Sequence, residues 1–135
     1  MISSVEKLRE ALTLAGLGVF ERDLRGEIVS VTPRLREIFG WHPDETVTVS
    51  GFLDRVHPGD RAQVAASIGR ADDPAGDGLL SIEHRLLLPD GRTRWVTTNA
   101  RTFFETDQTT GDQFARRVGT ILDVTDRKEA EERLR

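Results

Sequence analysis

The stretch LLSIEHRLLL, residues 79–88, followed by PDG at 89–91, decides how this chain folds. Every second residue from position 80 to position 88 is apolar, except for the histidine at 84, and the residues between them are mostly polar. This alternation is typical of a strand with one buried face. The PDG segment favours a tight turn, because proline presets φ and glycine adopts positive φ without strain. Residues 92–104 alternate in the same way, so we predict a long β-hairpin whose apolar face must be covered.

The first two helices of the chain are predicted from their start and stop signals. SSVE at 3–6 has the spacing of a capping box and opens an amphipathic helix over residues 1–16. Thr32-Pro33 predicts another helix, with a hydroxyl cap before a proline in its first turn, and Gly40 should end it. Residues 41–53 contain several helix breakers, so only short helical turns are expected there.

A third helix is predicted at 60–70. Either His57 or Asp60 could be its cap. Asp60 and Gln63 have the spacing of a capping box. Its inward residues should be Val64, Ala65 and Ile68.

The remaining strands are predicted at 18–24 and 27–31, around a turn at 25–26, and at 114–124. Helices between two blocks of antiparallel strands indicate an α+β domain. We expect a five-stranded antiparallel sheet with short helices packed on one face, and flanking N- and C-terminal helices. Its parts would be a flanking helix at 1–16, the body at 17–124 and an exit helix at 125–135, which Thr125-Asp126 should cap.

Composition excludes several classes of protein. The chain has 135 residues, a formal charge of −4 and no cysteine, so disulfides and thiolate metal sites are absent. Its acidic balance, without a basic stripe, argues against nucleic acid as a partner. The chain has neither an apolar run of membrane-spanning length nor the apolar core of a signal peptide, so the expected location is the cytoplasm, without membrane contact.

Five motifs in register carry a family resemblance. They are TPRLREIFG at 32–40, VHPGDR at 56–61, EHR at 83–85, DG at 90–91 with RW at 94–95, and GTILDVTDRK at 119–128. Together they resemble the PAS domain with its C-terminal PAC motif. The resemblance implies a cytosolic sensing and dimerisation module of a bacterial signalling protein, joined to a histidine kinase, diguanylate cyclase or similar output domain. It also implies that any ligand lies between the inner face of the sheet and the middle helices.

No catalytic or metal-binding pattern is present. The chain lacks a G-x-S-x-G elbow, and Glu21 occupies a position where a dinucleotide fingerprint needs glycine. His42, His57 and His84 do not have metal-ligand spacing. We therefore expect no catalysis by the domain itself and no metal.

Flavin and haem are both disfavoured by the residues that the resemblance would assign to them. The light-sensing branch of the family uses a cysteine, which this chain lacks, and amides at positions that align with Leu86, Val96 and Ile121. None of these three can pair with the polar edge of a flavin. Haem-binding relatives commonly use a histidine of the long helix, and 60–70 has none. His84 is interpreted as a core histidine with a polar partner, or as a polar anchor for a ligand.

No cofactor is therefore expected, and a small apolar ligand is the favoured signal. The predicted pocket residues are Phe39, Phe52, Ile68, His84, Leu86, Val96 and Ile121. Two alternatives stay open: a PAS domain with a filled core that only dimerises and, more weakly, a haem sensor that uses His84.

Signal output and dimerisation are assigned to the two ends of the body. Asp123 and Thr125 form the predicted signalling junction, where Asp123 would accept hydrogen bonds at the helix start or pair with Arg94 or Arg85. The outer sheet face also carries apolar residues, and the N-terminal helix of the same chain or of a partner should cover it. The predicted homodimer interface consists of Val5, Leu8, Leu12, Ala15 and Trp95.

Overall fold

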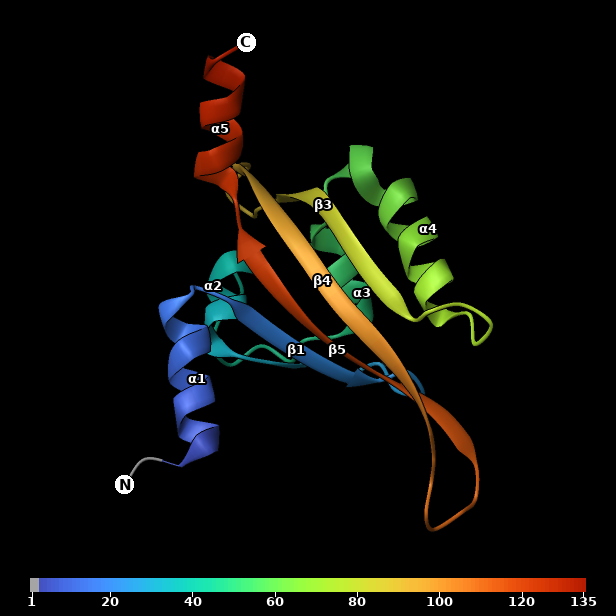
Figure 1. The fold of residues 1–135 in the computed structure, drawn as a ribbon. Helices are drawn as coiled ribbons and strands as arrows, with labels where there is room; N and C mark the ends of the chain where they lie inside the picture. Colours follow the sequence, from blue (N-terminus) through green and yellow to red (C-terminus); the bar gives the residue numbers. More distant parts are fainter. Residues whose placement is uncertain (1–2) are drawn as a thin grey trace.

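The computed structural model describes residues 3–135, and a five-stranded antiparallel sheet is its frame (Figure 1). The strands are β1 (Gly18–Asp23), β2 (Ser30–Val31), β3 (Leu79–Leu87), β4 (Thr93–Thr106) and β5 (Gln113–Asp123). Across the sheet their order is β2-β1-β5-β4-β3. The last strand in the sequence therefore lies at the centre, between β1 and β4, which confirms the predicted α+β class and sheet.

The predicted hairpin is formed by β3 and β4, with Leu80 opposite Ala100 and His84 opposite Val96. Gly91 makes the turn at a φ of 87°, and its N–H donates to the carbonyl of Leu88 at 2.9 Å. The inward-facing residues of both strands are buried, as the alternation of the sequence predicts.

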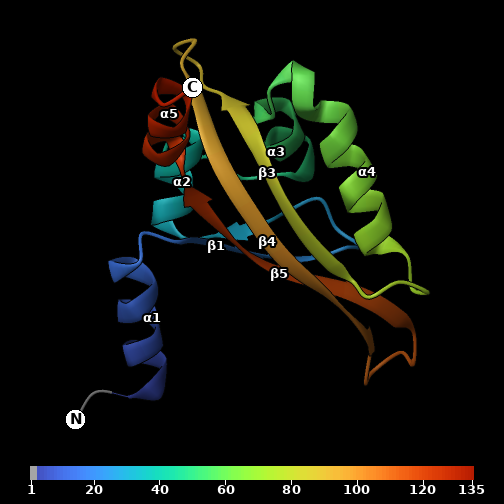
Figure 2. The ribbon, with the colours of Figure 1, turned by 45° about the horizontal axis from the view of Figure 1, so that its top comes forward.

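The middle helices cover the inner face of the sheet. They are α2 (Pro33–Phe39), α3 (Val49–Arg55), the 3-10 helix η1 (Pro58–Asp60) and α4 (Arg61–Asp72). α2 packs on β1 and α4 on β3, and Figure 2 shows α3 between them on the same side of the sheet. The flanking helices are α1 (Ser4–Leu14) and α5 (Thr125–Arg133). No helix within residues 3–135 is long and apolar enough to cross a membrane.

The strand predicted at 27–31 is shorter than expected, because most of it pairs elsewhere. The N–H of Val29 donates to the carbonyl of Val47, and the N–H of Val49 donates to that of Glu27, both at 2.9 Å. This pairing buries Val29 and Val47 in the core. Only β2 remains for pairing with β1.

Two predicted helix caps are wrong, because their hydroxyl groups bind neighbouring strands instead. Thr32 precedes α2, but its side chain accepts a hydrogen bond from the N–H of Val19 in β1 at 3.0 Å. Thr125 is the first residue of α5, and its hydroxyl accepts from the N–H of Trp95 in β4 at 3.0 Å. In both cases the threonine fastens a helix start to the sheet.

The start of α4 resolves the choice between His57 and Asp60. Nδ1 of His57 accepts from the N–H of Gly59 at 3.0 Å and so caps η1, whereas the carboxylate of Asp60 binds Arg85 instead of capping α4. The predicted inward position of Ala65 is wrong, since this residue is exposed. The inner face of α4 consists of Val64, Ser67, Ile68 and Ala71.

Residues 41–53, expected to be irregular, supply α3 and part of the core. Trp41 stacks on Phe39 with ring centroids 4.6 Å apart, and Phe52 lies 4.6 Å from Phe39 and 5.3 Å from Trp41. Phe20 of β1 joins the cluster at 5.6 Å from Phe52. The cluster fixes α2 and α3 against the sheet.

The N-terminal helix does not cover the outer sheet face of its own chain. No residue of α1 is buried, and Figure 1 shows the helix standing off the sheet beside the start of β1. Val118 and Leu122 on the outer face remain 39% and 37% exposed. Trp95, predicted to lie beneath this helix, is instead next to α5, with Nζ of Lys128 4.5 Å from its ring centroid. The prediction that the helix of the same chain covers this face is therefore wrong.

Candidate sensory site and signalling junction

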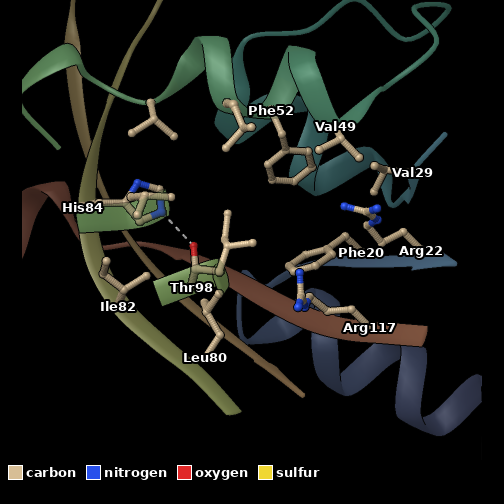
Figure 3. Close-up of a pocket in the computed structure, with 14 residues that line it drawn as sticks. Phe20, Arg22, Val29, Val49, Phe52, Leu80, Ile82, His84, Thr98 and Arg117 are labelled. Atoms are coloured by element: carbon tan, nitrogen blue, oxygen red, sulfur yellow. Dashed lines mark hydrogen bonds between the residues drawn. The ribbon is translucent and has the colours of Figure 1, made fainter. Parts of the chain in front are cut away.

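A cavity of about 80 Å³ lies between the inner face of the sheet and helices α3 and α4 (Figure 3). One water molecule needs about 10–15 Å³ on this measure, so there is room for several waters or a small organic molecule. Its apolar lining consists of Phe20, Val29, Val49, Phe52, Leu53, Val56, Val64, Ile68, Leu80 and Ile82. Its polar lining consists of Arg22, His84, Thr98 and Arg117.

The structure brings only part of the predicted pocket to this cavity. Phe52, Ile68 and His84 line it. The other predicted residues are fully buried in the core, where they pack the sheet against the helices; they are Phe39, Leu86, Val96 and Ile121. Strand alternation identifies the inner face but not where helices touch it.

Two arginines of the cavity were missed by the sequence analysis. Arg22 shares the inner face of β1 with Phe20, and Arg117 shares that of β5 with Ile121. The period of two along each strand was the available signal. Arginine was not expected at these inward positions, because charged residues are seldom fully buried.

His84 has the polar partner that burial of its ring requires. Its Nε2 lies 3.0 Å from the hydroxyl oxygen of Thr98 on β4, and the residue is 4% exposed. Burial lowers the pKa of His84 below its ordinary value, so the imidazole is neutral near pH 7. A neutral ring paired with a hydroxyl forms a polar spot in an otherwise apolar wall.

An ion pair joins the start of α4 to β3 at the edge of the cavity region. The carboxylate of Asp60 accepts the backbone N–H of Arg85 at 2.7 Å and two guanidinium N–H groups at 3.1 and 2.9 Å. These hydrogen bonds lower the pKa of Asp60. Because Arg85 follows His84, the helix over the cavity is attached to the strand that lines it.

The junction between β5 and α5 is held by hydrogen bonds and an ion pair. Asp123 accepts from the N–H and hydroxyl of Thr125 at 2.9 and 2.6 Å, and its other oxygen lies 3.3 Å from Nε of Arg94. Arg94 also donates to the carbonyl of Glu37 at the end of α2. Of the two predicted arginines, Arg94 is therefore the partner, since Arg85 binds Asp60.

The first turns of α5 are also attached to β3. Glu83 accepts from Lys128 at 2.9 Å and from Arg127 at 2.5 Å. These hydrogen bonds, led by that from Lys128, lower the pKa of Glu83. Glu83 and His84 are consecutive, so neighbouring side chains of one strand contact the exit helix and the cavity.

The sheet is antiparallel, its inner face is covered by helices over a cavity, and its central strand runs into an exit helix, which defines a small domain of the α+β class. The family model described as the PAS fold matches residues 28–111. The chain therefore belongs to the PAS family, as the sequence motifs indicated.

Several relatives are sensor proteins. A sensory box histidine kinase/response regulator from Burkholderia thailandensis is similar with a TM-score of 0.73 and 26% identity, over 96% of this chain and 92% of that one. An RNA-binding light-oxygen-voltage receptor has a TM-score of 0.64 and 26% identity, over 82% of this chain and 30% of that one. The blue-light-activated histidine kinase of Brucella anthropi is 30% identical over 129 residues, 95% of this chain and 24% of the relative. The chain thus spans about a quarter of the curated relatives it matches.

Proposed function

We propose that this PAS sensor domain detects a small apolar molecule in its cavity and relays a conformational change to an output domain of kinase or cyclase type. One observation carries the proposal: single strands reach from the cavity to the exit helix. On β4, Thr98 lines the cavity and Trp95 binds Thr125. On β3, His84 lines the cavity and Glu83 binds α5.

The relay would work by a shift in populations. A ligand that binds one arrangement of β3 and β4 more tightly than another shifts the equilibrium toward it. Because α5 is held through Glu83, Trp95 and Asp123, a displacement of these strands changes the angle at which α5 leaves the sheet. An output domain after α5 would respond to that angle.

We further propose that the domain works without flavin or haem. The cavity of about 80 Å³ contrasts with the roughly 300–1,000 Å³ typical of pockets for drug-sized ligands. The chain has no cysteine for a flavin adduct. Nε2 of His84, the atom that would bind haem iron, is paired with Thr98. A purified sample that absorbs at visible wavelengths would contradict this proposal.

Homodimerisation through α1 and the outer sheet face is part of the same proposal. Val5 and Leu8 are 59% and 62% exposed. Exposed apolar side chains are unfavourable in water, and a partner chain packed on them would remove that cost. These exposed residues also favour the second candidate function, a PAS domain that only dimerises.

The test separates the sensor from the pure dimerisation module. Native mass spectrometry of protein purified from cells reports retained ligand and oligomeric state together. In a titration, the neutral amphipathic probe hexanamide should bind the parent protein and change hydrogen exchange in α5. Ile68→Trp should fill the cavity and abolish binding, whereas Ala65→Trp, on the exposed side of the same helix, should not. If the protein retains no ligand and does not bind hexanamide, the result favours the dimerisation module.

A further inference from the structure

Two arginines at one end of the cavity have a single carboxylate partner between them. Arg22 of β1 and Arg117 of β5 lie directly opposite each other in the sheet. Figure 3 shows both guanidinium groups on the side of the cavity away from His84. Arg117 is 4% exposed and Arg22 is partly buried, so two like charges lie side by side with reduced access to water. Such an arrangement is costly unless anionic groups compensate it.

The positive charge of Arg117 is compensated by partners within the chain. Its Nε donates to the hydroxyl of Thr102 at 3.1 Å, and its Nη2 donates to the carboxylate of Asp72 at the end of α4. This pairing balances one of the two positive charges. The side chain of Asp72 is half-exposed and reaches Arg117 from the last turn of α4.

Arg22 is not compensated in the same way. Its Nη2 donates to the carbonyls of Leu24 and Gly26, both at 3.3 Å, and among residues 3–135 no carboxylate forms an ion pair with it. Its Nε is buried and has no hydrogen-bond partner within this part of the chain. Burial, followed by the charge of Arg117, lowers the pKa of Arg22, although an arginine stays protonated.

A purely structural role for Arg22 explains only part of this geometry. The two carbonyl contacts hold the turn after β1, but they use one nitrogen and leave Nε unsatisfied. Nε of Arg116 is also buried without a partner, yet Arg116 has its own carboxylate, Glu21, at 2.8 Å. Within residues 3–135, Arg22 therefore differs in lacking an ion-pair partner as well as a partner for Nε, and the carboxylates of Asp72, Glu27 and Asp23 act on it only at longer range.

We propose that the cavity binds a small monocarboxylate whose anionic end pairs with Arg22 and Arg117 and whose apolar body lies against Phe52, Ile68 and Leu80. The proposal rests on the proposed sensory function of the cavity. A single negative charge fits, because Asp72 already pairs with Arg117, whereas Arg22 has no ion pair within the described residues. A carboxylate suits the planar fork of donors on a guanidinium. At the other end, His84 and Thr98 satisfy each other, so that end does not require a second charge on the ligand.

The test compares hexanoate with hexanamide, which has the same length but no charge, on the whole chain. Calorimetry should show hexanoate binding at least about tenfold more tightly. The Nε–H resonance of Arg22 in nitrogen-15 spectra should shift with hexanoate and not with hexanamide. Arg22→Met should remove the preference for hexanoate while hexanamide still binds. Arg116→Met, on the opposite face of β5, is the control and should retain the preference.

Three outcomes would overturn the proposal. Equal binding of the two probes would leave the cavity as an apolar sensor and remove the anion site. A preference for hexanoate that persists in Arg22→Met would place the anion elsewhere. Binding of neither probe at about 10 mM would exclude the monocarboxylate site, since millimolar affinity is the least a specific site should reach. The retained-ligand measurement on protein from cells would then decide the sensory function by itself.

Discussion

The backbone N–H of Trp95 donates a hydrogen bond to the hydroxyl oxygen of Thr125 at 3.0 Å, and this contact fastens the exit helix to the sheet. Val124, the residue between β5 and α5, donates its N–H to the carbonyl of Trp95 at 2.9 Å. Both backbone groups of Trp95 are thus used to hold the start of α5. A movement of β4 at this point must move the helix or break these hydrogen bonds.

Asp123→Ala should separate stability from signalling. Asp123 is 26% exposed at its side chain and pairs with Arg94, so its loss should cost only about 0–1 kcal/mol of unfolding free energy. The melting temperature of the domain should barely move, while hydrogen exchange in α5 should become faster. In a fusion that places a histidine kinase after α5, basal output or its response to signal should change. Equal output from parent and variant, with and without stimulus, would show that Asp123 has no part in the relay.

Leu8→Asp combined with Leu12→Asp should yield a monomer that is still folded. Leu8 is 62% exposed, Leu12 is partly exposed and no residue of α1 is buried, so the charges should disturb mainly an interface with a second copy. Light scattering gives the mass, and circular dichroism controls for folding. The same dimeric mass in parent and variant would assign dimerisation to another surface such as α5. A monomeric parent would mean that residues 1–135 do not pair by themselves.

His84 should make stability depend on pH below about 6.5, its ordinary pKa. Because burial lowers the pKa of His84 in the folded state, the unfolded chain binds a proton that the folded chain does not. Its contribution is therefore fully present above that pH and is lost as pH falls below it. Urea unfolding of His84→Gln should show a flatter profile over this range. His42→Gln, at an exposed position, should keep the parent's profile.

Gly119→Ala should destabilise the centre of the sheet. A Cβ at this position would lie 2.4 Å from the ring of Phe20 and 2.8 Å from Cβ of Ala100, so the core must shift to admit it. We expect a loss of about 1–3 kcal/mol in chemical unfolding. Gly69→Ala is the matched control: its Cβ would meet nothing within 4 Å, and α4 should gain roughly 0.5–1 kcal/mol. Unchanged stability for Gly119→Ala would mean that Phe20 moves freely.

Local sequence signals determined the elements and the family of this protein. The alternation over 79–88 and the turn at Gly91 depend on neighbouring residues only, so the hairpin could be predicted in detail. The same holds for the left-handed helix end at Gly40 and for five family motifs in order. The acceptor role of Asp123 at the helix start was also local, because Thr125 is two residues away.

Tertiary structure alone decided which groups meet across the sheet. Thr32 and Asp60 are residue types that favour helix caps. In the structure, however, their side-chain oxygens accept hydrogen bonds from the N–H of Val19 in β1 and from Arg85 in β3 instead. The cavity depends on where helices fail to reach the inner face, which strand periodicity does not encode. Arg22 and Arg117 are far apart in the sequence and become neighbours only because β1 pairs with β5. Register between distant strands, rather than the pattern within any one strand, created the charged end of the cavity.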